Sequence, residues 1–150
     1  MADVSVTGIE ELMEEMQDAI KKYPDIAKEA LEDAGKKFKN AVKKETRRAT
    51  FTHTGNLLKG YKLDKVEGQG SFMHINFRAT APHFHLIENG HELVSQKTKK
   101  GKRLKNGGQN IGFVPGRLIV AAVRADFSEG KFPEEMEKAM EKLLKESRLL

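Results

Sequence analysis

The middle third of the chain most constrains the fold, because two apolar segments there flank a stretch that a core cannot hold. Residues 81–94 read APHFHLIENGHELV, and residues 112–123 read GFVPGRLIVAAV. Uncompensated like charges on a glycine-rich segment repel one another and stay hydrated. The sequence therefore predicts a flexible basic loop over residues 95–112, used to contact a partner or another copy of the chain. Its six bases, with no acid among them, are Lys97, Lys99, Lys100, Lys102, Arg103 and Lys105.

Length and composition indicate one domain over residues 1–150, with enough chain for a real core. The absence of cysteine excludes disulfides and thiolate zinc sites and agrees with synthesis in a reducing cytoplasm. The longest apolar run, Leu118 to Val123, is too short to cross a bilayer, so we expect no membrane partner. The acidic start also lacks the basic region of a secretory signal.

The net charge of +5 conceals a strong asymmetry along the chain. Residues 1–35 hold ten acids and three bases, residues 36–112 hold five acids and seventeen bases, and residues 113–150 hold seven of each. A dipolar molecule of this kind can associate head to tail with copies of itself or place its basic part near polyanions. The alternative is that these charges are simply solvated faces of one domain.

Hydrophobic periodicity predicts helices at both ends of the chain and strands between them. We expect a helix over residues 7–23, begun by a Thr7–Glu10 capping box and broken or restarted at Pro24, and a second helix over 25–48. The runs 61–67 and 72–79 predict a β-hairpin, and residues 56–58 a short helical turn before it. In the second run Met73, Ile75, Phe77 and Ala79 alternate with His74, Asn76 and Arg78, which is the period of a half-buried strand.

Farther along, residues 82–88 fit a strand or a short helix, and Ile111 and Phe113 suit a further strand. Residues 117–125 suit a short helix, although residues 118–123 would also satisfy a buried strand. A last helix should begin at Pro133. The predicted class is α+β: a small, mainly antiparallel sheet packed with N-terminal and C-terminal helices, with a long basic hairpin loop.

The sequence offers little support for a reaction centre. The five histidines (His53, His74, His83, His85 and His91) lack metalloprotease spacing, and aromatic and aliphatic residues interleave with them, which favours structural roles over metal ligation. No serine lies in a nucleophile elbow, and the loop glycines match neither a phosphate loop nor a dinucleotide fingerprint. We therefore expect a protein that is not an enzyme and binds no cofactor or metal.

Two pieces of the chain, HLIENGHELV at residues 85–94 and GFVPGRLIVAAV at residues 112–123, together resemble a tailed-bacteriophage family. This is the tail-component or neck family typified by gene product ten of the lambdoid phage HK-97. Thr54-Gly55-Asn56-Leu57 is similar to the short element that precedes the family's first strand. The chain departs from the family pattern at His83-Phe84 and at Leu118-Ile119. The residues that carry the resemblance are Gly55, Leu57, His85, Glu88, Gly90, Pro115 and Gly116.

The resemblance implies a virion structural protein, made in the host bacterial cytoplasm, that joins the head connector to the tail during assembly of a phage or prophage particle. It implies a ring of identical subunits, such as a hexamer, that contacts head-completion or connector proteins and tail-tube or tail-terminator proteins, with passing DNA as a non-specific contact. We further expect Gly90 to adopt a positive φ and Glu88 to accept backbone N–H bonds.

Two other functions remain open from the residues alone. A small basic nucleic-acid-binding module would explain the isoelectric point near 9.3, although no recognition motif is present and aromatic residues are only 7% of the chain. A toxin-like or nuclease enzyme would have to use the histidine cluster, and metal analysis would test it.

Overall fold

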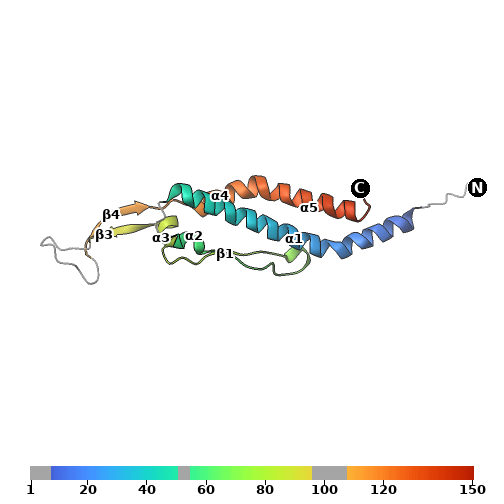
Figure 1. Ribbon diagram of the computed structural model, residues 1–150, viewed down its shortest axis with the longest axis horizontal. Coiled ribbons are helices and arrows are strands. Elements are labelled where there is room, and N and C mark those ends of the chain that lie inside the picture. Colours follow the sequence, from blue (N-terminus) through green and yellow to red (C-terminus); the bar gives the residue numbers. More distant parts are fainter. Residues whose placement is uncertain (1–7, 51–54, 96–107) are drawn as a thin grey trace, which may run out of the picture.

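A computed structural model describes residues 8–50, 55–95 and 108–150 of the chain. The molecule is elongated and is organised along one helix, α1 (Ile9–Ala49), as Figure 1 shows. At a rise of 1.5 Å per residue, a helix of 41 residues is about 60 Å long. Figure 1 shows the N-terminal end of α1 extending past the other described elements.

Pro24 lies inside α1, so the predicted break into two helices is wrong. A proline interior to a helix removes the hydrogen bond to the carbonyl of residue i−4, here Ile20, and tends to kink the helix. Pro24 is exposed to solvent, and Ile26, two residues later, is buried. Packing on the C-terminal side therefore holds the helix together, and Figure 1 shows α1 changing direction in its N-terminal part. The helix begins after Gly8 without a side-chain cap, and Thr7 lies outside the described residues.

The first hairpin is present but its ladder is shorter than predicted. Helix α2 (Asn56–Lys59) leads into β1 (Tyr61–Leu63), which pairs antiparallel with β2 (Phe77–Ala79). The 3₁₀ turn η1 (Gly70–Phe72) lies between the strands. Burial nevertheless alternates along residues 73–79 as predicted, including the residues before β2. The half-buried residues are Met73, Ile75, Phe77 and Ala79, and the exposed ones are His74, Asn76 and Arg78.

The second hairpin carries the apolar pieces of the middle third. Residues 82–88, which the sequence left open between strand and helix, contribute to α3 (Phe84–Asn89). Strand β3 (Gly90–Val94) follows and pairs antiparallel with β4 (Asn110–Pro115). Residues 110–112, expected to belong to the flexible loop, are part of β4, and the six loop bases lie outside the described residues.

The C-terminal helices form one continuous helical run instead of two separate helices. Helix α4 (Ile119–Asp126) passes through the π-helical turn η2 (Phe127–Lys131) into α5 (Phe132–Glu146). Pro133 lies in the first turn of α5, directly after the turn that changes the hydrogen-bonding register. Because proline has no N–H to donate, this is a position where the missing bond is tolerated.

The core lies where α1 meets α4, α2 and the first hairpin. Val42, Leu57, Tyr61, Val120 and Val123 form its buried cluster. The rings of Phe38 and Phe77 meet edge to face at 5.2 Å between centroids. In Figure 1, α4 and α5 cover one side of α1 and the β1–β2 hairpin covers the other. The α+β class is confirmed, with the strands divided between two separate two-stranded sheets.

One polar pair is built into this core. The hydroxyl of Thr46, fully buried, donates to the carbonyl of Val42 at 2.7 Å and lies 2.9 Å from the Tyr61 hydroxyl. Burial raises the pKa of Tyr61 above its ordinary value, and the hydrogen bond with Thr46 opposes that rise. The pair fixes the start of the first hairpin against α1.

Candidate functional site

Glu88 ties the start of α4 to α3, although thirty residues separate them in sequence. Its carboxylate is buried, and Oε1 accepts hydrogen bonds from the backbone N–H of Val120 at 3.0 Å and of Ala121 at 3.1 Å. Helix α4 starts after Leu118, whose φ of 47° is unusual for a non-glycine residue and whose side chain makes no cap. Glu88 therefore supplies the N-terminal cap that α4 lacks, and the expectation that it accepts backbone N–H bonds is confirmed.

Two glycines, Gly90 and Gly116, allow the backbone at the end of α3 to approach the backbone before α4 closely. Gly90 has φ 86° and ψ 175°, so the expected positive φ is confirmed. A Cβ on Gly90 would lie 2.5 Å from the Val114 carbonyl oxygen and 2.6 Å from the Gly116 nitrogen, and a Cβ on Gly116 would collide with the Glu88 carbonyl oxygen. Arg117 N–H donates to the Ile87 carbonyl at 2.8 Å. We call the contact of Glu88, Gly90, Gly116 and the start of α4 the hairpin junction.

The remaining residues of the resemblance are dispersed around this junction. Pro115 pairs with Gly90 at the base of the hairpin, and His85 is exposed on α3. Leu57 belongs to the buried core, and Gly55, with φ 68°, begins α2. The role expected for these family-motif residues is a structural one, and it stays a prediction.

The histidines are not gathered into a metal site in the part of the chain that the structure describes, where no group of three or more histidine or acidic residues could hold an ion. His53 lies outside that part. Nδ1 of His74 is 3.2 Å from the Phe72 carbonyl oxygen, as expected for a structural histidine. Nδ1 of His91 is buried without a hydrogen-bond partner among the described residues.

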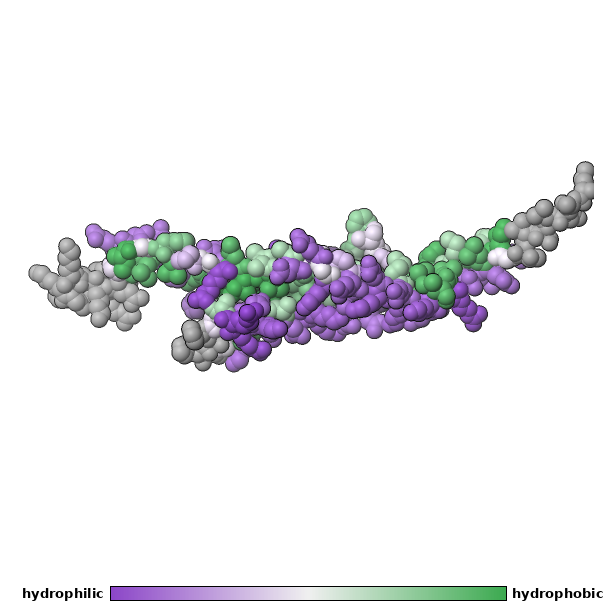
Figure 2. Space-filling view, turned by 90° about the horizontal axis from the view of Figure 1, so that it is seen from above, coloured by the Kyte–Doolittle hydropathy of each residue, from purple (hydrophilic) through white to green (hydrophobic). Residues whose placement is uncertain are grey.

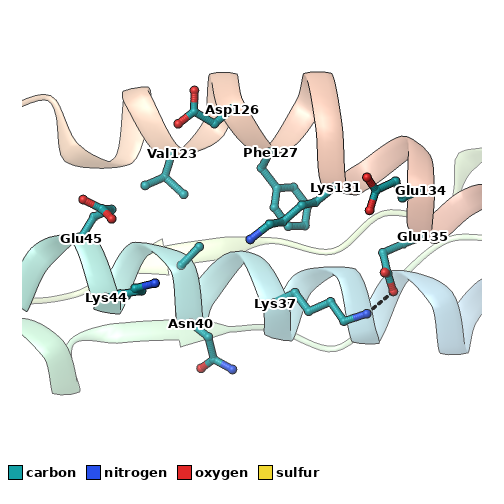
Figure 3. A pocket seen from close by; sticks show the side chains of 11 residues that line it. Lys37, Asn40, Lys44, Glu45, Val123, Asp126, Phe127, Lys131, Glu134 and Glu135 are labelled. Carbon is teal, nitrogen blue, oxygen red and sulfur yellow. Dashed lines mark hydrogen bonds and ion pairs between the residues drawn. The ribbon is translucent and has the colours of Figure 1, made fainter.

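An open pocket of about 580 Å³ lies between α1 and the run from α4 to α5 (Figure 3). Phe127 and Val123 supply apolar surface, and an ion pair between Lys37 and Glu135 bridges the two helices at one end. Charges of both signs line it, so it has the character neither of an anion site nor of an apolar ligand pocket. The charged residues are Lys37, Lys44, Glu45, Asp126, Lys131, Glu134 and Glu135.

Exposed apolar side chains gather instead at the two ends of the molecule, as Figure 2 shows. One end is the N-terminal part of α1. Its apolar side chains, here called the helix stripe, are between 48% and 70% exposed: Ile9, Leu12, Met13, Met16 and Ile20. The sequence predicted their helical spacing but gave no sign that the fold leaves them uncovered.

The other end is the β3–β4 hairpin, which projects past the helices in Figure 1. Its apolar side chains, here called the hairpin patch, are between 38% and 63% exposed: Leu93, Val94, Ile111, Phe113 and Val114. Contiguous exposed apolar surface marks interaction sites in soluble proteins. This patch could not be predicted from the sequence, because apolar segments on both sides of a loop have the composition of a buried core. Only the alternation of Ile111 and Phe113 indicated a strand.

None of the helices in the described residues combines the length and apolar character needed to cross a membrane. No curated protein and no solved structure gives a significant match to the chain. A family model does match, over residues 10–90, and its description reads "Bacteriophage HK97-gp10, putative tail-component". The match spans α1, the first hairpin and α3, and ends at Gly90 of the hairpin junction. Since it covers more than half of the 150 residues, the chain belongs to the HK97 gp10-like family of bacteriophage tail components.

Proposed function

We propose that this tail-component protein is a structural virion protein that joins the head connector to the tail during assembly, and that it acts without catalysis. The observation that carries the proposal is the family match over residues 10–90. The exposed apolar ends support it, because a protein that works inside a larger assembly keeps surfaces that only its neighbours cover.

The protein acts as several identical copies arranged in a ring, which contacts connector proteins on one side and tail proteins on the other. Different surfaces at the two ends of one chain favour head-to-tail contacts, and a head-to-tail contact closes into a ring when its rotation allows. The whole of residues 1–150 serves as one domain in this arrangement. The basic loop residues, from Lys97 to Lys105, contact a neighbouring copy or a partner ring, and the virion is where the protein works.

Deleting the gene from a phage or prophage that encodes the protein tests the joining role. The expected result is separate filled heads and complete tails in electron micrographs, with joined particles restored by the gene supplied in trans. Mass spectrometry of purified wild-type particles should find the protein in the virion. Infectious particles made in normal yield without the gene would overturn the proposal.

The nucleic-acid-binding alternative predicts different results for the purified protein and for the virions. Lysines that neutralise phosphates make affinity fall steeply with salt. Tight, salt-sensitive binding of the purified protein to duplex DNA, together with its absence from virions, would favour that alternative over a joining role.

A further inference from the structure

We propose that copies of this chain associate end to end, with the hairpin patch of one copy packed on the helix stripe of the next. The inference rests on the proposed function and adds to it the two surfaces that meet. Both surfaces consist only of described residues, and both are exposed in the single chain.

The helix stripe is an unpartnered face of a helix that is otherwise charged. Successive positions at 100° per residue place Ile9, Met16 and Ile20 along one line of α1. The acids occupy the opposite side, where several of them line an open pocket with residues 146–148 at the end of α5. Lys22, which pairs with Asp18, also donates to the Glu146 carbonyl at 2.5 Å. Contacts with α5 therefore use the acidic side and leave the apolar line outward.

The hairpin patch is equally incomplete by itself. A two-stranded ribbon is marginally stable in water unless something packs on it. The register places Phe113 opposite Glu92 and Val114 opposite His91, and successive residues of a strand point to opposite faces. Apolar side chains therefore lie on both faces of the ribbon, and Phe113 is 63% exposed. Figure 1 shows no described element over the outer part of the ribbon.

The hairpin patch fits within the length of the helix stripe. The helix stripe runs from residue 9 to residue 20, so it spans roughly 18 Å at 1.5 Å per residue. The part of β4 that belongs to the hairpin patch, Ile111 to Val114, spans roughly 13 Å at about 3.3 Å per residue. They lie at opposite ends of an elongated molecule, so one copy cannot cover its own stripe with its own patch (Figure 1).

Charge decides which pairing is favoured. Residues 9–20 carry five acids and no base, whereas residues 96–107, which join β3 to β4, carry six bases and no acid. Stripe against stripe pairs two helix segments of like negative charge, and hairpin against hairpin pairs two segments of like positive charge. Stripe against hairpin brings opposite charges together, and electrostatic complementarity of this kind selects the partner and the orientation. The occupant of each surface is therefore a second copy of this chain.

Two substitutions in the full-length protein test the two surfaces one at a time. Met16→Lys places a cation in the helix stripe, and its matched control is Met140→Lys on α5, because both methionines are 52% exposed. Ile111→Glu places an acid in the hairpin patch, and its control is Phe72→Glu at an exposed residue of the first hairpin. All four side chains are exposed, so circular dichroism and melting temperature should match those of the wild type.

Sedimentation velocity over a concentration series gives the readout. We expect the wild type and both controls to gain mass as concentration rises, and each of the other two variants to stay monomeric at concentrations at least tenfold higher. A mixture of Met16→Lys with Ile111→Glu should form pairs, because the first keeps its hairpin patch and the second keeps its helix stripe. Wild-type protein that stays monomeric throughout, or either variant that self-associates like the wild type, would overturn the proposal.

The absence of cysteine allows a second measurement that does not depend on affinity. Met16→Cys and Ile111→Cys, oxidised together, should give a disulfide-linked dimer, and each alone should give none. Dimers of Met16→Cys alone would show stripe against stripe and contradict the inference. The joining function is judged separately by the gene deletion, so a wrong surface assignment and a wrong function give different results.

Discussion

Removing the Glu88 carboxylate tests the hairpin junction. In Glu88→Ala, the N–H groups of Val120 and Ala121 lose their acceptor, and both belong to the first turn of α4. Loss of an N-terminal cap costs about 0.5–2 kcal/mol, and a buried donor left unpaired costs about 1–3 kcal/mol. Val120 is 7% exposed, so water cannot easily replace the carboxylate. We expect Glu88→Ala to lower the free energy of unfolding by roughly 2–4 kcal/mol.

Glu88→Gln is the matched control. Its amide oxygen can occupy the position of Oε1 and accept from both N–H groups, but the favourable interaction of a negative charge with the helix start, worth about 0.3–2 kcal/mol, is lost. The amide nitrogen also replaces Oε2, which lies 3.2 Å from the Val120 nitrogen. The glutamine variant should therefore lie between the wild type and Glu88→Ala in stability.

Urea unfolding followed by circular dichroism measures both variants, and amide hydrogen exchange at Val120 and Ala121 reports the cap locally. The expected order of stability is wild type, then Glu88→Gln, then Glu88→Ala, with faster exchange at the two amides in the alanine variant. A cost below about 0.5 kcal/mol for Glu88→Ala, the range of an ordinary surface substitution, would refute the reasoning.

Four further outcomes follow from the structure. Gly90→Ala should cost at least about 1–3 kcal/mol in urea unfolding, because its φ and ψ are accessible almost only to glycine; an unchanged melting temperature would contradict this. Val42→Ala, at a fully buried position, should cost about 2 kcal/mol through two lost methyl groups and the cavity they leave, whereas a cost near zero would place Val42 outside the core. Hydrogen bonds from Lys37 and then Lys138 lower the pKa of Glu135, so its contribution to stability is present above pH 4.5 and is lost as the pH falls through the lowered pKa. Glu135→Gln should therefore flatten acid destabilisation relative to the wild type, and identical acid profiles would refute this pairing. Deleting residues 97–105 should leave the melting temperature within a few degrees of the wild type yet block head–tail joining in the particle, and normal infectivity would refute that role for the loop.

Hydrophobic periodicity was sufficient to predict most of the fold. The spacing of apolar residues predicted the helices over α1, α4 and α5, and the alternation from Met73 to Ala79 predicted which side chains of the first hairpin are buried. The predicted break at Pro24 was wrong because the rule that proline ends a helix considers only local structure. Tertiary packing around Ile26 keeps α1 continuous. The same limit applies at η2, where a π-helical turn connects two helices that the sequence indicated as separate.

The hairpin junction was partly accessible from sequence. The positive φ of Gly90 and the acceptor role of Glu88 were predicted, because each depends on what one residue type does best. The approach of Gly116 to the backbone of Glu88 was not, since it depends on how two distant segments meet. Exposure of the helix stripe and the hairpin patch was also out of reach, because periodicity shows that a face is apolar but not what covers it.

The most direct test of the account is the structure of the head–tail junction in intact particles by cryo-electron microscopy. We predict a ring of copies of this chain between the connector and the tail, with each β3–β4 hairpin lying on the N-terminal part of α1 of the neighbouring copy. A fully resolved junction and tail that contain no copy of the chain would contradict the account.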